Sequence, residues 1–216
     1  MEESVERLKE EIVKVGKYLL DKDLTIGSSG NISVRVREKE LVLITPSGVP
    51  FDIMKPNDIV VVDMNGEVVE GERNPSTEMP THLRIYKERK DVNAIIHAHA
   101  IYTGALAATH TSIPAVLDEM ILYLGGEVEV AEYAPPGTEE LAENAVKALG
   151  RKKAVILANH GVLVCGKDLK DTLEILLRVE RVARIYILSK IIGEPKKLPK
   201  EAIEHELEIY ELLLEG

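Results

Sequence analysis

The sequence contains little cysteine and no long apolar run. One cysteine, Cys165, occurs among the 216 residues, which excludes an internal disulfide framework. No run of about 18 apolar residues is present, so no membrane span is expected. The first residues, MEESVERLKEE, lack the apolar stretch of a secretory signal. Together these absences favour a cytoplasmic protein in which Cys165 is a buried small side chain rather than a reactive thiol.

Other absences narrow the functional classes. The formal net charge is −10 and no extended basic patch occurs, so nucleic acid is not an expected partner. Neither a Walker motif nor a dinucleotide fingerprint is present. The lack of glutamine, combined with abundant lysine and glutamate, favours a thermophilic source. Since no repeat or convincing linker is found, the length predicts one domain over residues 1–216.

What is present is a mixture of helical and strand periodicities. Asn65-Gly66, between two apolar runs, is a strong hairpin signal. The mixture favours an α/β fold in which helices lie on the faces of a largely antiparallel sheet. The patterns predict helices over residues 4–20, from 78 or 80, over 101–108, from 138 to 150, from 168 to 193 and after 199, and strands over 32–36, 41–44, 59–62, 67–69, 93–99, 127–133, 154–158 and 162–164.

Two of the six histidines lie on one predicted strand, in His97-Ala98-His99. Side chains two residues apart leave the same face of a strand, with Cα atoms roughly 6.5–7 Å apart. Both imidazoles can therefore converge on one cation, while Ala98 packs on the opposite face. The alternative is that both histidines make ordinary hydrogen bonds at a strand end.

A third histidine and one glutamate extend this candidate site. His160 follows a buried strand and precedes Gly161, where the missing side chain permits a close approach. Glu78 begins a predicted helix, a position that favours acids on electrostatic grounds alone. As a metal ligand, its carboxylate would be able to leave the ion and move a proton. The three other histidines, His82, His110 and His205, are expected at the surface.

Three short loops combine glycine or proline with hydroxyl side chains: residues 27–31, 45–48 and 74–77. Such loops can present backbone N–H groups and hydroxyls to a phosphate. Each of them alone is better explained as a plain turn.

The motifs GSSGNISVR, ITPSG, PSTEMPTH, HAH and NHG, in this order, resemble the class II aldolase/adducin head family over about residues 5–190. Within that family the likeness is greatest to the branch that acts on L-fuculose 1-phosphate. The resemblance implies a three-layer α/β/α sandwich and a homotetramer with sites between neighbouring subunits. It also implies one Zn²⁺ ion per subunit, or another divalent ion, held by Glu78, His97, His99 and His160.

The resemblance further implies a reaction and a set of roles. A zinc-dependent aldolase would cleave a ketose 1-phosphate to dihydroxyacetone phosphate and an aldehyde such as lactaldehyde. Glu78 would be the catalytic proton donor and acceptor, because cleavage beside a carbonyl leaves a carbanion that must be protonated. The substrate would be bound by residues of the three loops: Gly30, Asn31, Ser47, Gly48, Ser76 and Thr77.

One departure leaves alternatives open. Asp118 and Glu119 stand where the aldolase branch has a tyrosine that protonates the aldehyde oxygen, and Tyr210 is a further candidate for that role. An aspartate in this region resembles the pattern of the related pentulose-phosphate 4-epimerases. An L-ribulose-5-phosphate 4-epimerase or a sugar-phosphate dehydratase is therefore an alternative, and so is a non-enzymatic, adducin-like assembly domain. A Schiff-base aldolase would need a lysine in an apolar stretch, and none is evident.

Overall fold

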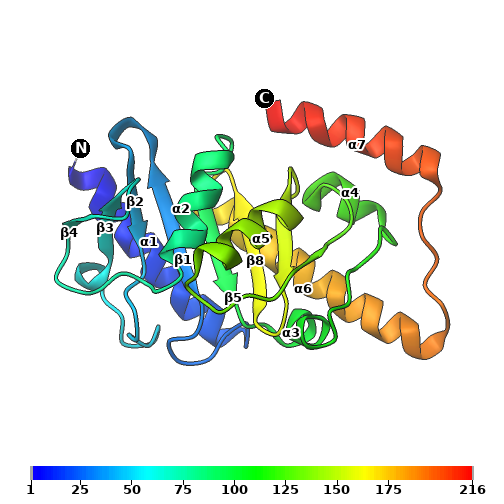
Figure 1. Cartoon of the computed structure of the whole chain (residues 1–216), viewed down its shortest axis with the longest axis horizontal. Helices are drawn as coiled ribbons and strands as arrows, with labels where there is room; N and C mark the ends of the chain where they lie inside the picture. The colour runs from blue at the N-terminus through cyan, green and yellow to red at the C-terminus, as the bar shows by residue number, and fades with distance from the viewer. Residues whose placement is uncertain (1, 216) are drawn as a thin grey trace.

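The computed structural model describes the backbone of residues 2–215 and the side chains of residues 5–214. Its centre is an eight-stranded sheet in the order β4-β3-β2-β1-β5-β8-β7-β6 (Figure 1). Every neighbouring pair is antiparallel except β6 and β7. The strands are β1 Asn31–Val36, β2 Leu41–Ile44, β3 Val60–Asp63, β4 Val68–Glu70, β5 Ala94–Ala98, β6 Val130–Ala131, β7 Ala154–Leu157 and β8 Gly161–Gly166.

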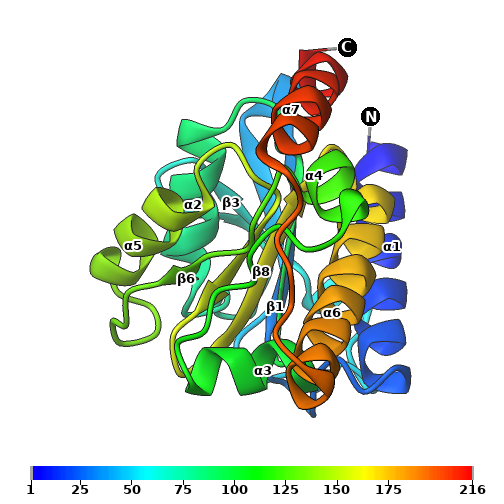
Figure 2. The same cartoon turned by 90° about the vertical axis from the view of Figure 1, so that its right-hand side faces the viewer.

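Helices cover both faces of this sheet. Figure 2 shows α2 and α5 on one face and α1 and α6 on the other. The helices are α1 Glu2–Asp21, α2 Met79–Glu88, α3 Ile101–Ala108, α4 Asp118–Leu124, α5 Glu139–Leu149, α6 Leu169–Ile192 and α7 Lys200–Glu215. Two 3₁₀ turns, Arg37–Lys39 and Pro56–Asp58, complete the secondary structure of the described residues. The three-layer α/β/α sandwich with a largely antiparallel sheet is confirmed.

Two apolar cores follow from the three layers, because successive strand residues point to opposite faces. On β5, Ile96 and Ala98 belong to the core beneath α1 and α6, whereas Ile95 belongs to the core beneath α2 and α5. Strand β1 is predicted to be half-buried, yet Ser33 on its polar face is 0% exposed. The alternation is real, but α2 covers the face that the sequence pattern assigns to solvent. Cys165 on β8 is buried as expected.

The helix boundaries agree with the capping signals. Thr138 and Asp168 each accept a backbone N–H at the start of α5 and α6, as Ser, Thr, Asp and Asn commonly do. Helix α4 was not predicted, because its seven residues span too few turns for a periodic pattern. Strand β6 is shorter than the predicted 127–133: only Val130 and Ala131 pair with β7. None of the helices in the described part of the chain has the length and apolar character needed to cross a membrane.

The C-terminal helix packs on α4 at one end of the molecule. The Tyr210 side chain is 2% exposed and lies against Gly125, at the end of α4. Its hydroxyl donates a hydrogen bond to the Arg151 carbonyl, and Glu211 forms an ion pair with the Arg151 guanidinium. These contacts fix α7 close to the start of β7.

Candidate metal and substrate site

The candidate site lies at the edge of the sheet formed by the ends of its central strands, where several chain segments meet. Strands β5 and β7 end there, and β1 and β8 begin there, because neighbouring strands alternate in direction. Asn31, the first residue of β1, is paired in register with His97 near the end of β5. His160 lies in the turn between β7 and β8. The site thus combines residues far apart in sequence but adjacent in the sheet.

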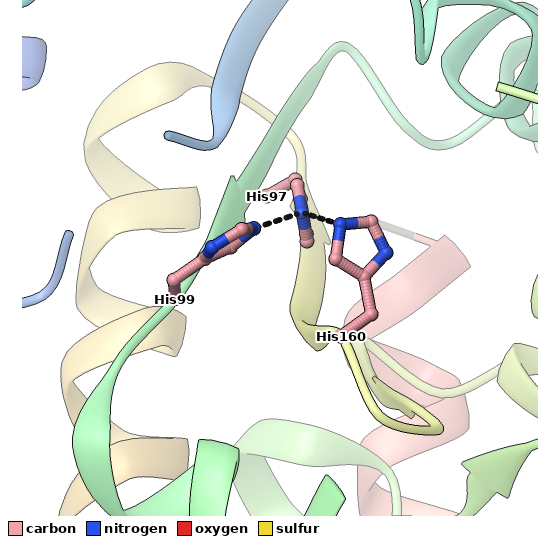
Figure 3. A group of neighbouring side chains, drawn as sticks. All are labelled: His97, His99 and His160. Atoms are coloured by element: carbon pink, nitrogen blue, oxygen red, sulfur yellow. Dashed lines mark hydrogen bonds between the residues drawn. The ribbon is translucent and has the colours of Figure 1, made fainter. Parts of the chain in front are cut away.

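Three imidazoles converge at this edge. The Nε2 atom of His97 is 3.0 Å from that of His99 and 3.2 Å from that of His160 (Figure 3). Nitrogen ligands on a tetrahedral ion with bonds of 2.0–2.1 Å would be about 3.3 Å apart. The spacing therefore fits a single divalent cation between the three rings. The prediction that His97 and His99 share one face is confirmed, and Ala98 packs in the opposite core.

The hydrogen bonding and ionisation of His97 suit a ligand. Its Nδ1 atom lies 3.0 Å from the Val162 carbonyl oxygen, which can only accept, so Nδ1 carries the proton and Nε2 keeps its lone pair. Burial lowers the pKa of His97 to about 3, which keeps the ring neutral near pH 7. Burial likewise lowers the pKa of His99. Neutral imidazoles are the form that binds a cation.

Glu78 approaches the same point from the start of α2. One of its carboxylate oxygens is 3.5 Å from His97 Nε2, and the other is 3.5 Å from His160 Nε2. Burial would raise the pKa of Glu78, but a hydrogen bond with His160 and the charges of nearby imidazoles outweigh it and lower the pKa to about 2. A carboxylate that stays ionised beside the imidazole nitrogens supplies the negative charge that favours a divalent cation.

Gly161 makes the convergence of the rings possible. A Cβ atom on this glycine would lie 2.5 Å from the Ala98 carbonyl oxygen and 3.1 Å from a ring carbon of both His97 and His99. The carbonyl oxygen belongs to a paired strand and cannot move alone. The expectation that Gly161 serves a close approach is confirmed.

The Gly161→Ala variant should therefore bind metal more weakly. We expect the free energy of unfolding to fall by about 1–3 kcal/mol, the usual effect of overpacking, and metal affinity to fall by more than about tenfold. Denaturant titration and competition with a coloured chelator measure these two quantities. Gly104→Ala is the matched control, because nothing lies within 4 Å of its added Cβ. Unchanged affinity in Gly161→Ala would contradict the close-packing argument.

The three candidate phosphate loops are linked by backbone hydrogen bonds. The Ser76 N–H donates to the Thr45 carbonyl and the Ser47 N–H to the Asn74 carbonyl, which joins loops 45–48 and 74–77. The Phe51 N–H donates to the Gly27 carbonyl, which joins loop 27–31 to the segment that follows the second loop. These bonds hold the three loops together near the start of β1, where Asn31 pairs with His97.

Within the loops, two residues lie closest to His97. Gly30 has a φ of +80°, and a Cβ there would be 2.5 Å from the His97 carbonyl oxygen, so only glycine fits. Asn31 is 2% exposed, and its Oδ1 atom has no hydrogen-bond partner among the described residues. A buried amide oxygen without a partner is rare unless a ligand supplies one. Ser76 is nearly buried, whereas Ser47, Gly48 and Thr77 are exposed at the rim, where they are accessible to a solute.

The three histidines outside the cluster differ in exposure. His82 was expected at the surface, and this is wrong: it is 0% exposed, because α2 turns it toward the sheet. The helical spacing from Glu78, four residues earlier, was the signal that could have located it. His110 is exposed as expected, and its Nε2 atom lies 2.6 Å from Asn159 Oδ1, next to His160. His205 is exposed on α7.

The candidates for the aldehyde-side acid lie away from this edge within the chain. Asp118 is exposed at the start of α4, and Glu119 forms ion pairs with Arg178 and Arg181 of α6. Tyr210 bonds to Arg151, before the start of β7, whereas His160 follows the end of that strand. None of the three carries a contact to the imidazole cluster in the described structure.

Comparison with known proteins gives concordant matches. The family model described as "Class II Aldolase and Adducin N-terminal domain" matches residues 10–187. A 5-deoxy-D-ribulose 1-phosphate aldolase of Bacillus thuringiensis is 40% identical over 201 residues, 93% of this chain and 94% of that protein. The L-fuculose phosphate aldolase of Escherichia coli K12 is 36% identical over 172 residues, 80% of this chain and 79% of that protein. A solved L-fuculose 1-phosphate aldolase has a TM-score of 0.90 at 49% identity and covers 94% of this chain and 95% of that one.

Proposed function

Because the chain belongs to the class II aldolase and adducin N-terminal domain family, we propose that it is a zinc-dependent aldolase acting on a deoxyketose 1-phosphate. The products would be dihydroxyacetone phosphate and a short aldehyde. The observation that carries the proposal is the convergence of three Nε2 atoms at 3.0 and 3.2 Å with the Glu78 carboxylate beside them. The adducin-like alternative gives no reason for three imidazoles that converge on one point beside an ionised acid.

The residues fit a resident metal ion. His97, His99, His160 and Glu78 would hold it, and the donor set of imidazoles with one carboxylate suits Zn²⁺ among divalent ions. When bound, the ion supplies Lewis acidity that stabilises the negative charge developing beside the substrate carbonyl.

The protein groups divide the remaining work. Glu78, ionised and partly enclosed, would move the proton at the carbon where the C–C bond forms or breaks. The side-chain NH2 group of Asn31, a residue paired with His97 in the sheet, would donate a hydrogen bond to a substrate oxygen on which charge develops. Gly30, Gly48 and Thr77 would bind the phosphate through backbone N–H groups, and Ser47 and Ser76 through their hydroxyls, because the Ser47 and Ser76 N–H groups already donate to carbonyls. This arrangement would hold the phosphate end of the substrate and leave the aldehyde end to face outward.

Two substrates follow from the relatives. Cleavage between C3 and C4 converts L-fuculose 1-phosphate to lactaldehyde and 5-deoxyribulose 1-phosphate to acetaldehyde, with dihydroxyacetone phosphate in both cases. The relative that is 40% identical supports the five-carbon substrate, and the solved structure at 49% identity supports the six-carbon substrate. Both substrates carry a terminal methyl group, so they differ only in one hydroxymethylene unit at the aldehyde end.

The test is an assay of metal-loaded protein with each ketose 1-phosphate. Release of dihydroxyacetone phosphate would be followed by a coupled reductase, and the aldehyde would be identified after derivatisation. We expect release that a chelator abolishes and added Zn²⁺ restores, with the preferred substrate shown by the larger kcat/KM. No release from either compound would contradict the proposal. Formation of an isomeric pentulose phosphate from L-ribulose 5-phosphate would then indicate the epimerase.

We also propose that four copies assemble in the cytoplasm into a cyclic tetramer. Support comes from large apolar side chains left exposed at the end of α6 and on α7: Ile191, Ile192, Leu212 and Leu213 are each at least 69% exposed. A tetramer would also allow a neighbouring subunit to supply the aldehyde-side acid. Sedimentation equilibrium measures the mass directly, and a monomer at micromolar concentration would contradict this assembly.

A further inference from the structure

His82 is a buried polar residue that the proposed reaction leaves unused. It lies on α2 with 0% of its surface exposed. Its Nδ1 atom is 2.7 Å from Ser33 Oγ on β1. Its Nε2 atom, by contrast, has no hydrogen-bond partner among the described residues. Buried polar atoms are nearly always paired, so an unpaired one needs an explanation.

The direction of the neighbouring hydrogen bonds decides which ring nitrogen carries the proton. The Tyr86 hydroxyl is fully buried, and its one hydrogen-bond partner in the described structure is Ser33 Oγ at 2.8 Å. The phenol therefore donates its proton to Ser33. The Ser33 hydroxyl is then left to donate to Nδ1 of His82, which must be unprotonated. The proton of a neutral His82 consequently resides on Nε2, which makes the unpaired atom a donor.

This tautomer is the opposite of the one that His97 adopts in the imidazole cluster. His97 donates from Nδ1 to a carbonyl and so keeps a lone pair on Nε2. His82 accepts at Nδ1 from a hydroxyl and so presents an N–H at Nε2. The two buried rings are thus prepared for opposite tasks, since His97 can bind a cation and His82 can bind an anion.

The nearest anionic group along α2 is Glu78. Glu78 is the N-cap of α2 and His82 is the fourth residue of that helix, so the two lie about one turn apart along the chain. Helical side chains lean toward the N-terminus, so the ring of His82 covers the turn that Glu78 precedes. Burial lowers the pKa of His82 to about 4, with Glu78 as the charged group that opposes this shift. The ring is therefore neutral near pH 7.

We propose that His82 is a positioning residue that acts through Glu78. When substrate displaces the Glu78 carboxylate from His97 and His160, the Nε2–H of His82 donates a hydrogen bond to that carboxylate. This inference rests on the proposed function, in which Glu78 must leave the imidazoles to act on the substrate. It explains a buried donor that is unpaired in the present arrangement, because its partner arrives only in the displaced one. The ring itself neither gains nor loses a proton.

The kinetic test compares His82→Leu, His82→Gln and Ile85→Val. His82→Leu removes the donor, and we expect kcat to fall by about 10–100-fold while KM and metal content stay unchanged. His82→Gln keeps an N–H near the Nε2 position and should recover most of the lost kcat. Ile85→Val loosens the same helix without a polar change and should keep wild-type kcat. A folded, metal-loaded His82→Leu protein with kcat within twofold of wild type would overturn the proposal.

A second measurement does not depend on turnover. In protein with ¹⁵N-labelled histidine, NMR spectroscopy distinguishes the two ring tautomers. We expect His82 to carry its proton on Nε2, and this N–H resonance to move downfield when dihydroxyacetone phosphate is added to metal-loaded protein. A proton on Nδ1, or no shift with saturating ligand, would overturn the proposal. An inactive wild type with the expected tautomer and shift would count against the proposed reaction and leave the role of His82 supported.

Discussion

The Glu78→Gln variant should fold normally and lose kcat by about 10²–10⁴-fold, the usual contribution of a general acid or base. Glutamine has nearly the shape of glutamate, so the start of α2 is preserved. It cannot take up or release a proton, and it is a weaker partner for a cation. The variant should therefore also bind metal less tightly, and its kcat should be measured at saturating Zn²⁺.

Glu72→Gln serves as the control for this experiment. Glu72 is exposed six residues before Glu78 and carries the same charge, so its substitution should leave kcat unchanged. If Glu78→Gln kept more than a tenth of wild-type kcat at saturating metal, Glu78 would not be the proton-transfer group.

The His97→Asn variant should lose metal binding while the fold around it is retained. The asparagine amide can still donate to the Val162 carbonyl, as His97 Nδ1 does, but no atom occupies the position of Nε2. Loss of groups that only support metal ligands costs about 10–100-fold in affinity, so loss of a ligand should weaken binding by more than about 100-fold. Competition with a chelator of known affinity measures this change, and aldolase activity should fall with metal content.

His205→Asn is the matched substitution, because His205 is exposed on α7 and is not part of the imidazole cluster. It should bind metal as wild type does. Wild-type affinity in His97→Asn would show that the three converging rings are not the metal site. Circular dichroism of both variants checks that the fold is intact.

The sequence patterns predicted the features that depend on local spacing. The two-residue period of a strand places His97 and His99 on one face, and the cap residues Thr138 and Asp168 mark the starts of two helices. The approach of His160 to His97 and His99 depends instead on the pairing of β5 with β8. Local periodicity carries no information on that pairing. His160 was assigned to the ligand set only through the family resemblance that the five motifs carry.

The failures have equally physical causes. His82 and Ser33 were misplaced because a polar residue on an amphipathic pattern is assigned to solvent, and tertiary packing of α2 on the sheet buried both. Their burial is possible because they bond to each other. The bonds between the substrate loops are backbone hydrogen bonds between segments about 25–30 residues apart in the chain, which no side-chain pattern records.

The two outermost strands of the sheet have a consequence for solubility. Its outermost strands, β4 and β6, are three and two residues long, whereas the central strands β1 and β8 have six residues each. A strand at the margin of a sheet exposes unpaired N–H and C=O groups that another chain can join, and short strands expose few of them. Glu70 on β4 is also held in an ion pair by Lys9 of α1. The longer central strands are thus paired on both sides. The short edge strands leave few unpaired backbone groups to which another chain could add a strand.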